Sequence, residues 1–566
     1  MYPMKNVSRW QRISRRCNHK SIVWLIGLFV VTVLLYLINR DENETTLVVI
    51  NQIYDSDWFG WKKPTVSFKD KHHISTSEEF EQKVALINKV HRHRNIELGY
   101  TFYNEIFDII YQAKPKTRDM ANFLNEPIVS SRYDSTKSES RIFSEPYLSQ
   151  FLQMSLMDLS LMKQSHEAIL KSMPDKAPKR LYKGDGIVYV GGGKFNWLTL
   201  LSIYSVRQLG SKLPIEVLIP KIDEFEVELC GKILPELNAR CIYMPYVLPK
   251  NVNKKFQFKG YQYKALAILL SSFKNVLLLD SDNIPVRKPD YLFTKEPFKS
   301  KGLIVWPDFW KRTTSPLYYS IAGIEPSTTE LWDKYNELEG KYVPQQLAAG
   351  VDLDSVPLHE RKNSIPDPTS ESGQLMINKD THMKSLLVAL YYNLYGPSHY
   401  YPLFSQGGSG EGDKETFLAA TVATKKSYYQ VGTFLDAFGY INLAKNFVGT
   451  GMGQFDPVQD YLHCVKDGDK PSIMFVHANH PKLNPWKLKT LGKIFNEDHG
   501  RVRLYGTGMR IRCGYDFEFG QWTNMKHLLC ERKINLKAFE KVDRSKICEE
   551  LDEHLAFLKD SEGTLE

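Results

Sequence analysis

The sequence contains few cysteines, and none of them is spaced for a metal site. Its 566 residues include 7 cysteines without a CxxC pair, which excludes a structural zinc site of the usual kind. The glycine-rich stretch GGGK at 191–194 does not fit the pattern G-x-x-x-x-G-K-S/T of a phosphate-binding loop. An EF-hand at Asp280 is excluded as well, because Pro285 and Tyr291 occupy the positions of its glycine and glutamate.

The chain also lacks a large excess of charge outside its first twenty residues. The formal net charge is +9. Six of these units come from the N-terminal tail, which contains no acid and carries Lys5, Arg9, Arg12, Arg15, Arg16 and Lys20. The remainder carries only 9 minus 6, or +3, so the composition gives no support for nucleic-acid binding.

A long uncharged segment follows this basic tail. Residues 21–38, SIVWLIGLFVVTVLLYLI, contain no charged side chain, and these 18 residues exceed the roughly 17 that a helix needs to cross a bilayer. A cleaved signal peptide would have a shorter apolar region, about 7 to 15 residues, and a small-residue cleavage site, whereas NRDE follows here. We therefore predict an uncleaved signal anchor rather than a cleaved signal or a buried soluble helix, with the chain after Arg40 in the lumen.

The predicted lumenal part has features that suit the secretory pathway. The short span favours the thinner membranes of the endoplasmic reticulum or Golgi, and NET at 43–45 is a glycosylation sequon. Six cysteines fall in this oxidising compartment, where some should pair. Proximity in sequence predicts Cys230 with Cys241 and Cys530 with Cys548, while the spacing alone leaves the connectivity open.

We predict four regions along the chain. They are a cytoplasmic tail at 1–20, a transmembrane anchor at 21–38, a partly helical stem at 39–144 and a lumenal domain at 145–566. The stem contains one amphipathic helix, predicted from the helical spacing of Leu98, Phe102, Ile106, Ile109 and Ile110. A second helix is predicted from Pro146 to Met173, because apolar residues recur on one face and Pro174 ends the pattern.

From Gly184 onward, strands and helices alternate. GIVYV, IEVLIP, CIYM and NVLLLD predict strands, and the segments between them predict helices, such as WLTLLSIYSVRQLG and YQYKALAILLSSF. This alternation predicts an α/β fold with a Rossmann-like parallel arrangement of strands, covered by helices on both faces. Ligands in such sheets bind at the carboxyl ends of the strands.

Two aspartates stand at the end of the fourth predicted strand, in VLLLDSDNIP at 276–285. Carboxylates one residue apart repel each other near apolar surroundings unless a cation or donors compensate them. Two hard oxygen donors favour Mg²⁺ or Mn²⁺, which can also neutralise a diphosphate. The glycines at 191–193 follow the first strand at the same edge and allow the backbone to approach a ligand closely. Each signal is weak when taken alone.

Three later stretches concentrate functional residue types. They are SESGQLMINK at 370–379 with Glu371, Gly373 and Gln374, GGSGEGDKETFLAA at 407–420 with Glu411, Asp413, Lys414 and Glu415, and SIMFVHANHPKLNPW at 472–486 with His477, His480 and Lys482. A charged turn is usually solvated, and a single histidine is usually structural. Their recurrence beside apolar strands nevertheless predicts a shared crevice.

Together with WPDFWKR at 306–312 and ALYYNLYGP at 389–397, these motifs resemble the fungal Golgi alpha-1,2-mannosyltransferases of glycosyltransferase family 71. The chain most resembles the members that branch the outer mannan chain, and the likeness covers residues 184–522. It implies a type II Golgi membrane protein with a catalytic domain of the GT-A type, a nucleotide-sugar-binding fold that uses GDP-mannose and Mn²⁺. Mannan or N-glycan acceptors and complexes with other Golgi mannosyltransferases are the partners it implies.

The resemblance also assigns roles to individual residues. Asp282 becomes a direct metal ligand, Asp280 is shared between metal and ribose, and His477 completes the coordination, while His480 lies off the pattern. Contacts with the nucleotide and its diphosphate fall to Gly192, Gly193, Lys194, Lys264 and Lys482. The sugar and acceptor side falls to Glu371, Gln374, Asp413 and Lys414, which with the two aspartates are the predicted catalytic residues.

Family membership further implies that the alpha configuration of the donor is retained. No carboxylate identifies itself as the nucleophile that retaining glycosidases use. The acceptor hydroxyl is therefore expected to attack from the face of the leaving group, with a diphosphate oxygen taking its proton. The alternatives left open are an alpha-1,3-mannosyltransferase, a mannosylphosphate transferase with the same donor site, and an inactive mannan-binding protein.

Overall fold

The computed structural model describes residues 71–92, 94–134, 141–336, 341–462 and 470–561. The predicted tail, the anchor at 21–38 and the sequon lie outside these residues. Within the described ranges, no helix combines the length and the apolar character needed to cross a membrane. The chain divides into two compact units, Met1–Ser75 and Thr76–Glu566, and the core and the site described below belong to the second.

The main sheet has seven strands in the order β10-β6-β9-β4-β1-β2-β3. The four strands β4, β1, β2 and β3 are parallel, as the alternation of strands and helices predicted, whereas β9 runs antiparallel to both β4 and β6. The sheet is therefore mixed, and the α/β class is confirmed. Its strands are β1 (Asp185–Val190), β2 (Ile215–Ile219), β3 (Ala239–Tyr243), β4 (Asn275–Leu279), β6 (Leu303–Pro307), β9 (Ser370–Asn378) and β10 (Tyr429–Gln430).

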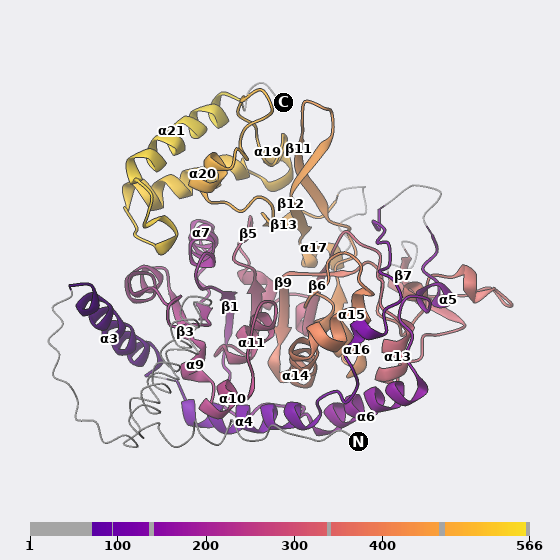
Figure 1. Ribbon diagram of the computed structural model, residues 1–566. Coiled ribbons are helices and arrows are strands. Elements are labelled where there is room, and N and C mark those ends of the chain that lie inside the picture. The colour runs from indigo at the N-terminus through magenta and orange to yellow at the C-terminus, as the bar shows by residue number, and fades with distance from the viewer. Residues whose placement is uncertain (1–70, 93, 135–140, 337–340, 463–469, 562–566) are drawn as a thin grey trace, which may run out of the picture. The chain divides into compact units, whose positions relative to one another are not determined.

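A second, antiparallel sheet begins at β5, directly after β4, and its strands β5, β12 and β13 lie above β1 and β9 in Figure 1. Its order is β11-β12-β13-β5, so the short strand that follows the aspartates pairs with a strand far along the chain. The strands are β5 (Asn283–Pro285), β11 (Asp436–Ile441), β12 (Phe447–Phe455) and β13 (Ile473–His477). A separate hairpin pairs β7 (Glu330–Asn336) with β8 (Lys341–Gln346).

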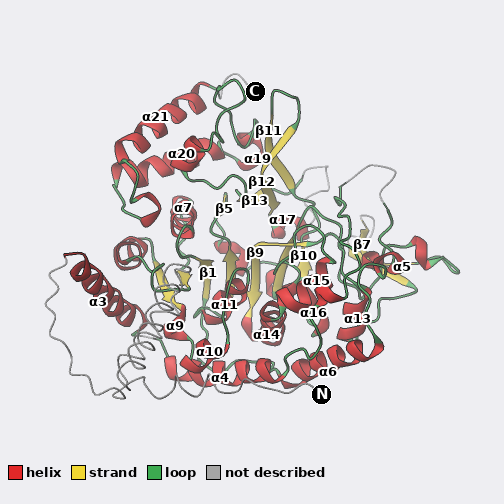
Figure 2. Cartoon of the chain, in the orientation of Figure 1, coloured by secondary structure: helices red, strands yellow, loops and turns green. Residues whose placement is uncertain are grey.

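Alternate residues of the central strands enter two hydrophobic cores. Val188 and Leu278 pack with helices α4, α11 and α14 on one face, and Ile187 and Leu277 pack with α7 and the C-terminal helices on the other. The period-two pattern of the strands thus buries both faces, as expected for a central α/β sheet. Figures 1 and 2 show α7, α20 and α21 away from α4, α6 and α14.

The helices connect and cover these strands (Figure 2). Their bounds are α3 (Lys71–His91), α4 (Ile96–Gln112), α5 (Glu145–Leu148), α6 (Leu156–Ser172), α7 (Phe195–Gln208), α8 (Leu234–Glu236), α9 (Met244–Val247), α10 (Lys250–Lys255), α11 (Gln262–Leu270), α12 (Phe298–Lys301), α13 (Pro316–Ala322), α14 (Lys379–Leu394), α15 (Tyr401–Ser405), α16 (Thr416–Ala423), α17 (Pro457–Tyr461), α18 (Pro485–Thr490), α19 (Met509–Cys513), α20 (Phe517–Lys526) and α21 (Arg544–Asp560).

Helix α4 confirms the amphipathic helix predicted within the stem. Its apolar side chains, among them Phe102, Ile106 and Ile110, are buried in the same core as α11 and α14. Residues 76–144, which we predicted as part of the stem, therefore belong to the compact unit that also contains the sheet.

The helix predicted from Pro146 to Met173 is wrong in its extent. It is interrupted between α5 and α6, where Leu152 forms a β-bridge with Leu124. Ser155 then starts a new helix by accepting a hydrogen bond from the backbone N–H of Asp158. A side-chain cap and a tertiary contact thus divide an apolar pattern that is continuous in the sequence.

Both predicted disulfides are present. Cys230 bonds Cys241 and Cys530 bonds Cys548. Each joins segments that are close in sequence, so proximity was a sufficient guide. Among the described residues Cys513 is a free, buried cysteine.

Candidate active site

The two aspartates occupy the turn between the main sheet and the second sheet. Strand β4 ends at Leu279, and the backbone N–H of Asp280 donates to the carbonyl of Gly373 on the neighbouring β9, at 2.8 Å. Strand β5 begins at Asn283 and joins the second sheet. The chain between them leaves one sheet for the other, so Asp280 and Asp282 lie at the carboxyl edge where ligands of α/β sheets bind.

His477 reaches this turn from the second sheet. It is the last residue of β13 and pairs in register with Asn283 of β5. Its Nε2 lies 3.4 Å from Asp282 Oδ1, and its Nδ1 lies 3.2 Å from Glu371 Oε1. Burial lowers the pKa of His477, but the carboxylates of Glu371 and Asp282 outweigh burial and raise that pKa to about 10.

The donor set fits a divalent cation. One ligand atom each from Asp280, Asp282 and His477 lies within 4.8 Å of the other two. Carboxylate oxygens suit Mg²⁺ and Mn²⁺, and imidazole nitrogen is a common ligand of first-row divalent ions. Asp282 and His477 are buried and Asp280 is half-buried, so their positions are constrained by packing.

Two lysines of the chain itself also compensate the aspartate pair. Lys264 Nζ on α11 donates to Asp280 Oδ2 at 2.8 Å, and Lys482 Nζ contacts Asp282 Oδ2. Burial raises the pKa of Asp282, but His477 and Lys482 outweigh burial and hold that pKa below its usual range. Burial dominates at Asp280 and raises its pKa. The repulsion between the aspartates is thus offset by groups on α11, on β13 and in the loop that follows β13.

The antiparallel strand β9 brings its first residues to the same edge. Leu279 at the end of β4 is opposite Gln374, so the amino end of β9 lies beside the carboxyl end of β4. The pairing with β6 shifts register between Val305 and Trp306, which leaves 372–374 as a local irregularity. Bulges of this kind re-aim side chains beside active sites. Here the backbone N–H of Gly373 donates to Glu371 Oε1 at 2.6 Å.

Asp413 joins the cluster through Ser372. The Ser372 hydroxyl donates to Asp413 Oδ1 at 3.2 Å, and Lys264 Nζ donates to the Ser372 carbonyl and hydroxyl and lies 3.8 Å from Asp413 Oδ2. Burial raises the pKa of Asp413 to about 6, although Lys264 lowers it. Within the described part of the chain, Asp413 Oδ2 and Glu371 Oε2 are buried without a hydrogen-bond partner. Each carboxylate thus has one buried acceptor oxygen whose hydrogen-bonding capacity is not used by the described residues.

Three predicted site residues have partners other than the aspartate pair, or no contact with the cluster among the described interactions. Lys414 donates instead to Asp308 Oδ2 at 2.5 Å, and Lys194 is exposed over the ring of Phe195 at 5.2 Å. Gln374 is fully buried, and its Oε1 accepts from the side-chain amide of Asn283. Gln374 therefore joins β9 to β5 through a buried hydrogen bond.

The predicted nucleotide-contact glycines lie at the same edge of the sheet. They follow β1, which runs parallel to β4 with Tyr189 opposite Leu279. Gly192 and Gly193 adopt φ angles of +101° and +52°, which side-chain-bearing residues rarely take.

Sequence reasoning missed the connecting residues Ser372 and Asp308. Ser372 lies within a stretch that we selected, yet a serine between two strong candidates carries no separate signal. Asp308 lies in WPDFWKR, a stretch that indicated the family but in which no residue was assigned a role. Its partner Lys414 is 106 residues away in the sequence. Local spacing cannot reveal either contact.

Comparisons with known proteins agree with the geometry. A mannosyltransferase family model matches residues 184–456. Alpha-1,2-mannosyltransferase MNN21 of Candida albicans is 53% identical over 89% of this chain and 82% of its own length. Alpha-1,2-mannosyltransferase MNN2 of Saccharomyces cerevisiae is 36% identical over 81% of this chain and 85% of its own length.

A solved structure, the glycosyltransferase GlyE of Streptococcus pneumoniae TIGR4, aligns with 14% identity over 44% of this chain and 45% of that chain. Its TM-score of 0.25 is too low to carry an argument, so the family rests on the sequence relatives. With 53% identity over most of both chains, this protein belongs to the fungal alpha-1,2-mannosyltransferase family and is a glycosyltransferase.

Proposed function

We propose that this protein transfers mannose from GDP-mannose to alpha-mannose acceptors of the outer mannan chain, forming alpha-1,2 linkages with retention. The cluster of Asp280, Asp282 and His477 at the carboxyl edge of the sheet carries the proposal. It supplies carboxylate and imidazole donors at the place where an α/β sheet of the GT-A kind would receive a nucleotide sugar. The alpha-1,2 linkage is taken from the names of the relatives.

Asp280, Asp282 and His477 would hold the cation, for which Mn²⁺ is our choice. When bound, such an ion stabilises the negative charge that develops on a departing diphosphate. Lys482 can add to this effect, because its side chain is 47% exposed and long enough to turn from Asp282 toward a ligand. Gly192 and Gly193 would face the nucleotide.

The carboxylates on the other side of the cluster would orient sugar hydroxyls. Glu371 and Asp413 are each fixed by one oxygen and have a second oxygen without a hydrogen-bond partner among the described residues. Those oxygens can accept hydrogen bonds from donor or acceptor hydroxyl groups. Because both side chains are already anchored, orientation fits them better than nucleophilic attack. The acceptor hydroxyl would then attack from the leaving-group face and pass its proton to a diphosphate oxygen.

The test is to supply purified full-length protein with GDP-mannose, Mn²⁺ and linear alpha-1,6-mannose oligomers, and to determine the product linkage by NMR. We expect alpha-1,2-linked mannose, lost in Asp282→Ala. An alpha-1,3 product, or phosphate in the product, would overturn the assigned reaction. Saccharide binding without any turnover would instead identify a mannan-binding protein.

We further propose that residues 21–38 anchor the protein in the Golgi membrane with the site in the lumen, where complexes with other mannosyltransferases can form. The uncharged segment and its basic flank support this topology. Glycosylation at Asn43, detected as a mass shift on glycosidase treatment, would agree with it. Staining confined to another compartment would contradict it.

A further inference from the structure

The turn at 191–193 is conformationally demanding and closely packed. A Cβ on Gly191 would lie 2.6 Å from Val217 Cγ1, and a Cβ on Gly192 would lie 2.6 Å from Glu224 Oε2. Val217 is fully buried, so Gly191 has no room for a Cβ, whereas Gly192 requires glycine because of its φ of +101°. A run of glycines is flexible, however, and a flexible turn would lose entropy on binding a ligand. The structure should therefore contain groups that hold the turn.

Asn196, on the first turn of α7, is such a group. Its Oδ1 accepts a hydrogen bond from the backbone N–H of Gly192 at 2.7 Å. Its Nδ2 donates to the carbonyl of Glu224 at 3.0 Å and to Glu226 Oε1 at 2.7 Å. The residue is only 1% exposed, so these bonds are protected from water. The side chain thus joins the glycine turn to the segment that follows β2.

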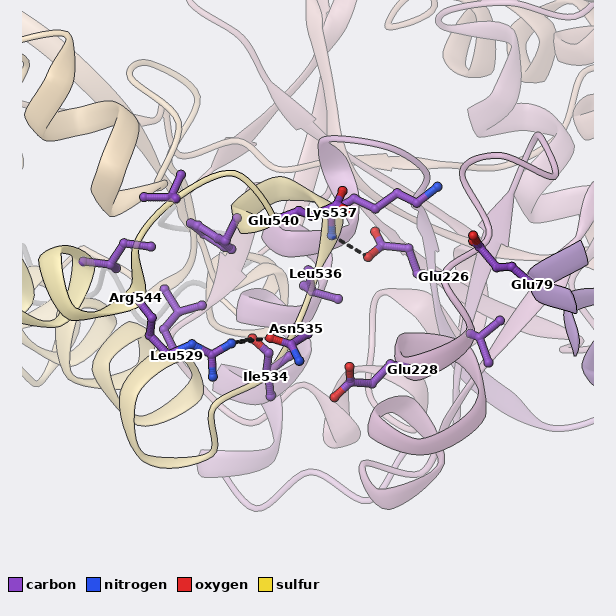
Figure 3. A pocket seen from close by; sticks show the side chains of 14 residues that line it. Glu79, Glu226, Glu228, Leu529, Ile534, Asn535, Leu536, Lys537, Glu540 and Arg544 are labelled. Carbon is purple, nitrogen blue, oxygen red and sulfur yellow. Dashed lines mark hydrogen bonds between the residues drawn. The ribbon is translucent and has the colours of Figure 1, made fainter. Parts of the chain in front are cut away.

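Glu226 fixes which way the Asn196 amide points. A carboxylate can only accept, so it requires the NH₂ of Asn196 and leaves the amide oxygen for Gly192. The other oxygen of Glu226, Oε2, accepts from the backbone N–H of Lys537 at 2.8 Å. Figure 3 shows this bond beside a pocket of about 370 Å³ that is lined by Glu79, by residues 226–228 and by residues of the C-terminal region between 529 and 547. A chain of hydrogen bonds therefore runs from Lys537 to the glycine turn.

We propose that Asn196 and Glu226 are positioning residues that preorganise the glycine turn for the nucleotide of the donor. The inference rests on the proposed function, in which this turn faces the nucleotide of GDP-mannose. Neither side chain need touch the substrate. Their effect is on the binding of the donor, because they settle the conformation of the turn before the nucleotide arrives.

The direction of the bonds gives a specific test by exchange of the two residue types. Asn196→Asp places two carboxylates against each other, and Glu226→Gln sets an amide donor against either Asn196 or the Lys537 N–H. In the double variant N196D/E226Q, the introduced amide NH₂ can donate to the introduced carboxylate, and the amide oxygen can accept from the Lys537 N–H. The total charge is unchanged, but the Glu224 carbonyl loses its donor and faces a carboxylate oxygen instead, so the recovery is expected to be incomplete.

The experiment measures KM and kcat of the full-length enzyme for GDP-mannose and, separately, for the acceptor. Each single variant should raise the KM for GDP-mannose about tenfold, the effect of one buried hydrogen bond, with the acceptor KM little changed. The double variant should recover most of the donor affinity. Glu228→Gln is the matched control, since Glu228 lines the same pocket and should leave the donor KM unchanged.

A merely structural role would reduce the amount of folded enzyme, and therefore the apparent kcat, without changing KM. Single variants with a donor KM within twofold of wild type would overturn the proposal, and so would a double variant no better than N196D. If N196D alone does not fold, the recovery of folded, tightly binding protein in the double variant still supports the exchange, and its absence contradicts it. A wild-type enzyme that transfers no mannose from GDP-mannose would instead refute the proposed function.

Discussion

Replacing Gly373 with alanine adds one methyl group at the point where the two sheets meet the site. The new Cβ would lie 2.6 Å from His477 Nδ1 and 2.7 Å from Glu371 Oε1. Ordinary contact begins near 3.4 Å, so the imidazole must move by about 0.8 Å. A misplacement of about 1 Å can cost roughly 10²-fold in rate. We therefore expect kcat/KM to fall about 10²-fold and the Mn²⁺ concentration needed for half activity to rise.

The assay is mannose transfer from GDP-mannose over a range of Mn²⁺ concentrations, together with thermal unfolding. Gly449→Ala is the matched control, because Gly449 lies on β12 of the sheet that carries His477 and its Cβ would meet only Phe447 Cε1 at 3.7 Å. The control should keep near-normal activity. If Gly373→Ala were folded and within threefold of wild type at every Mn²⁺ concentration, His477 would not be the constrained metal ligand that we propose.

Three further predictions concern the metal, the exposed lysine and a buried histidine. EDTA should abolish mannose transfer and added Mn²⁺ should restore it, measured as GDP release. Full activity in EDTA would show that transfer does not require a divalent cation. Lys482→Met should lower kcat about 10²-fold with little change in unfolding temperature, because the Lys482 side chain is 47% exposed, and an unchanged kcat would contradict its role at the diphosphate. Burial lowers the pKa of His91 from 6.5 to about 4, its Nε2 accepting from the Tyr243 N–H. Between these two pKa values, His91 binds a proton in the unfolded protein but not in the folded one. The free energy of unfolding should therefore fall by about 2 kcal/mol between pH 7 and pH 5. Urea unfolding should show a smaller fall in His91→Gln, and an identical pH dependence in both proteins would refute this.

The local pattern of the chain was sufficient to predict the four parallel strands and the position of the aspartate pair at their carboxyl edge. Each of those strands is a short apolar run between helix signals, and the position of Asp280 follows from where β4 ends. The two disulfides could also be predicted locally, because the cysteines of each pair lie close in sequence. The apolar periodicity of residues 98–110 also predicted helix α4. The burial of α4 in the core could not be predicted, because the surrounding sequence is charged and polar.

The rest of the site depends on long-range pairing. We selected Glu371 and Gly373 before an apolar strand, but only an antiparallel β9 brings the beginning of that strand to the carboxyl edge of β4. His477 was expected to end another strand at a shared crevice, and it reaches Asp282 from a separate sheet. Register between distant strands is set by tertiary packing, which a single sequence does not encode locally.

The burial of α4 determines where a shortened version of the enzyme, without the proposed anchor, can begin. Truncation at residue 145, the natural choice if everything before it were a spacer, would remove Phe102, Ile106 and Phe107 from the hydrophobic core that they share with α11 and α14. Such a protein would expose a large apolar surface and would aggregate during expression. A start no later than Thr76 keeps the compact unit whole.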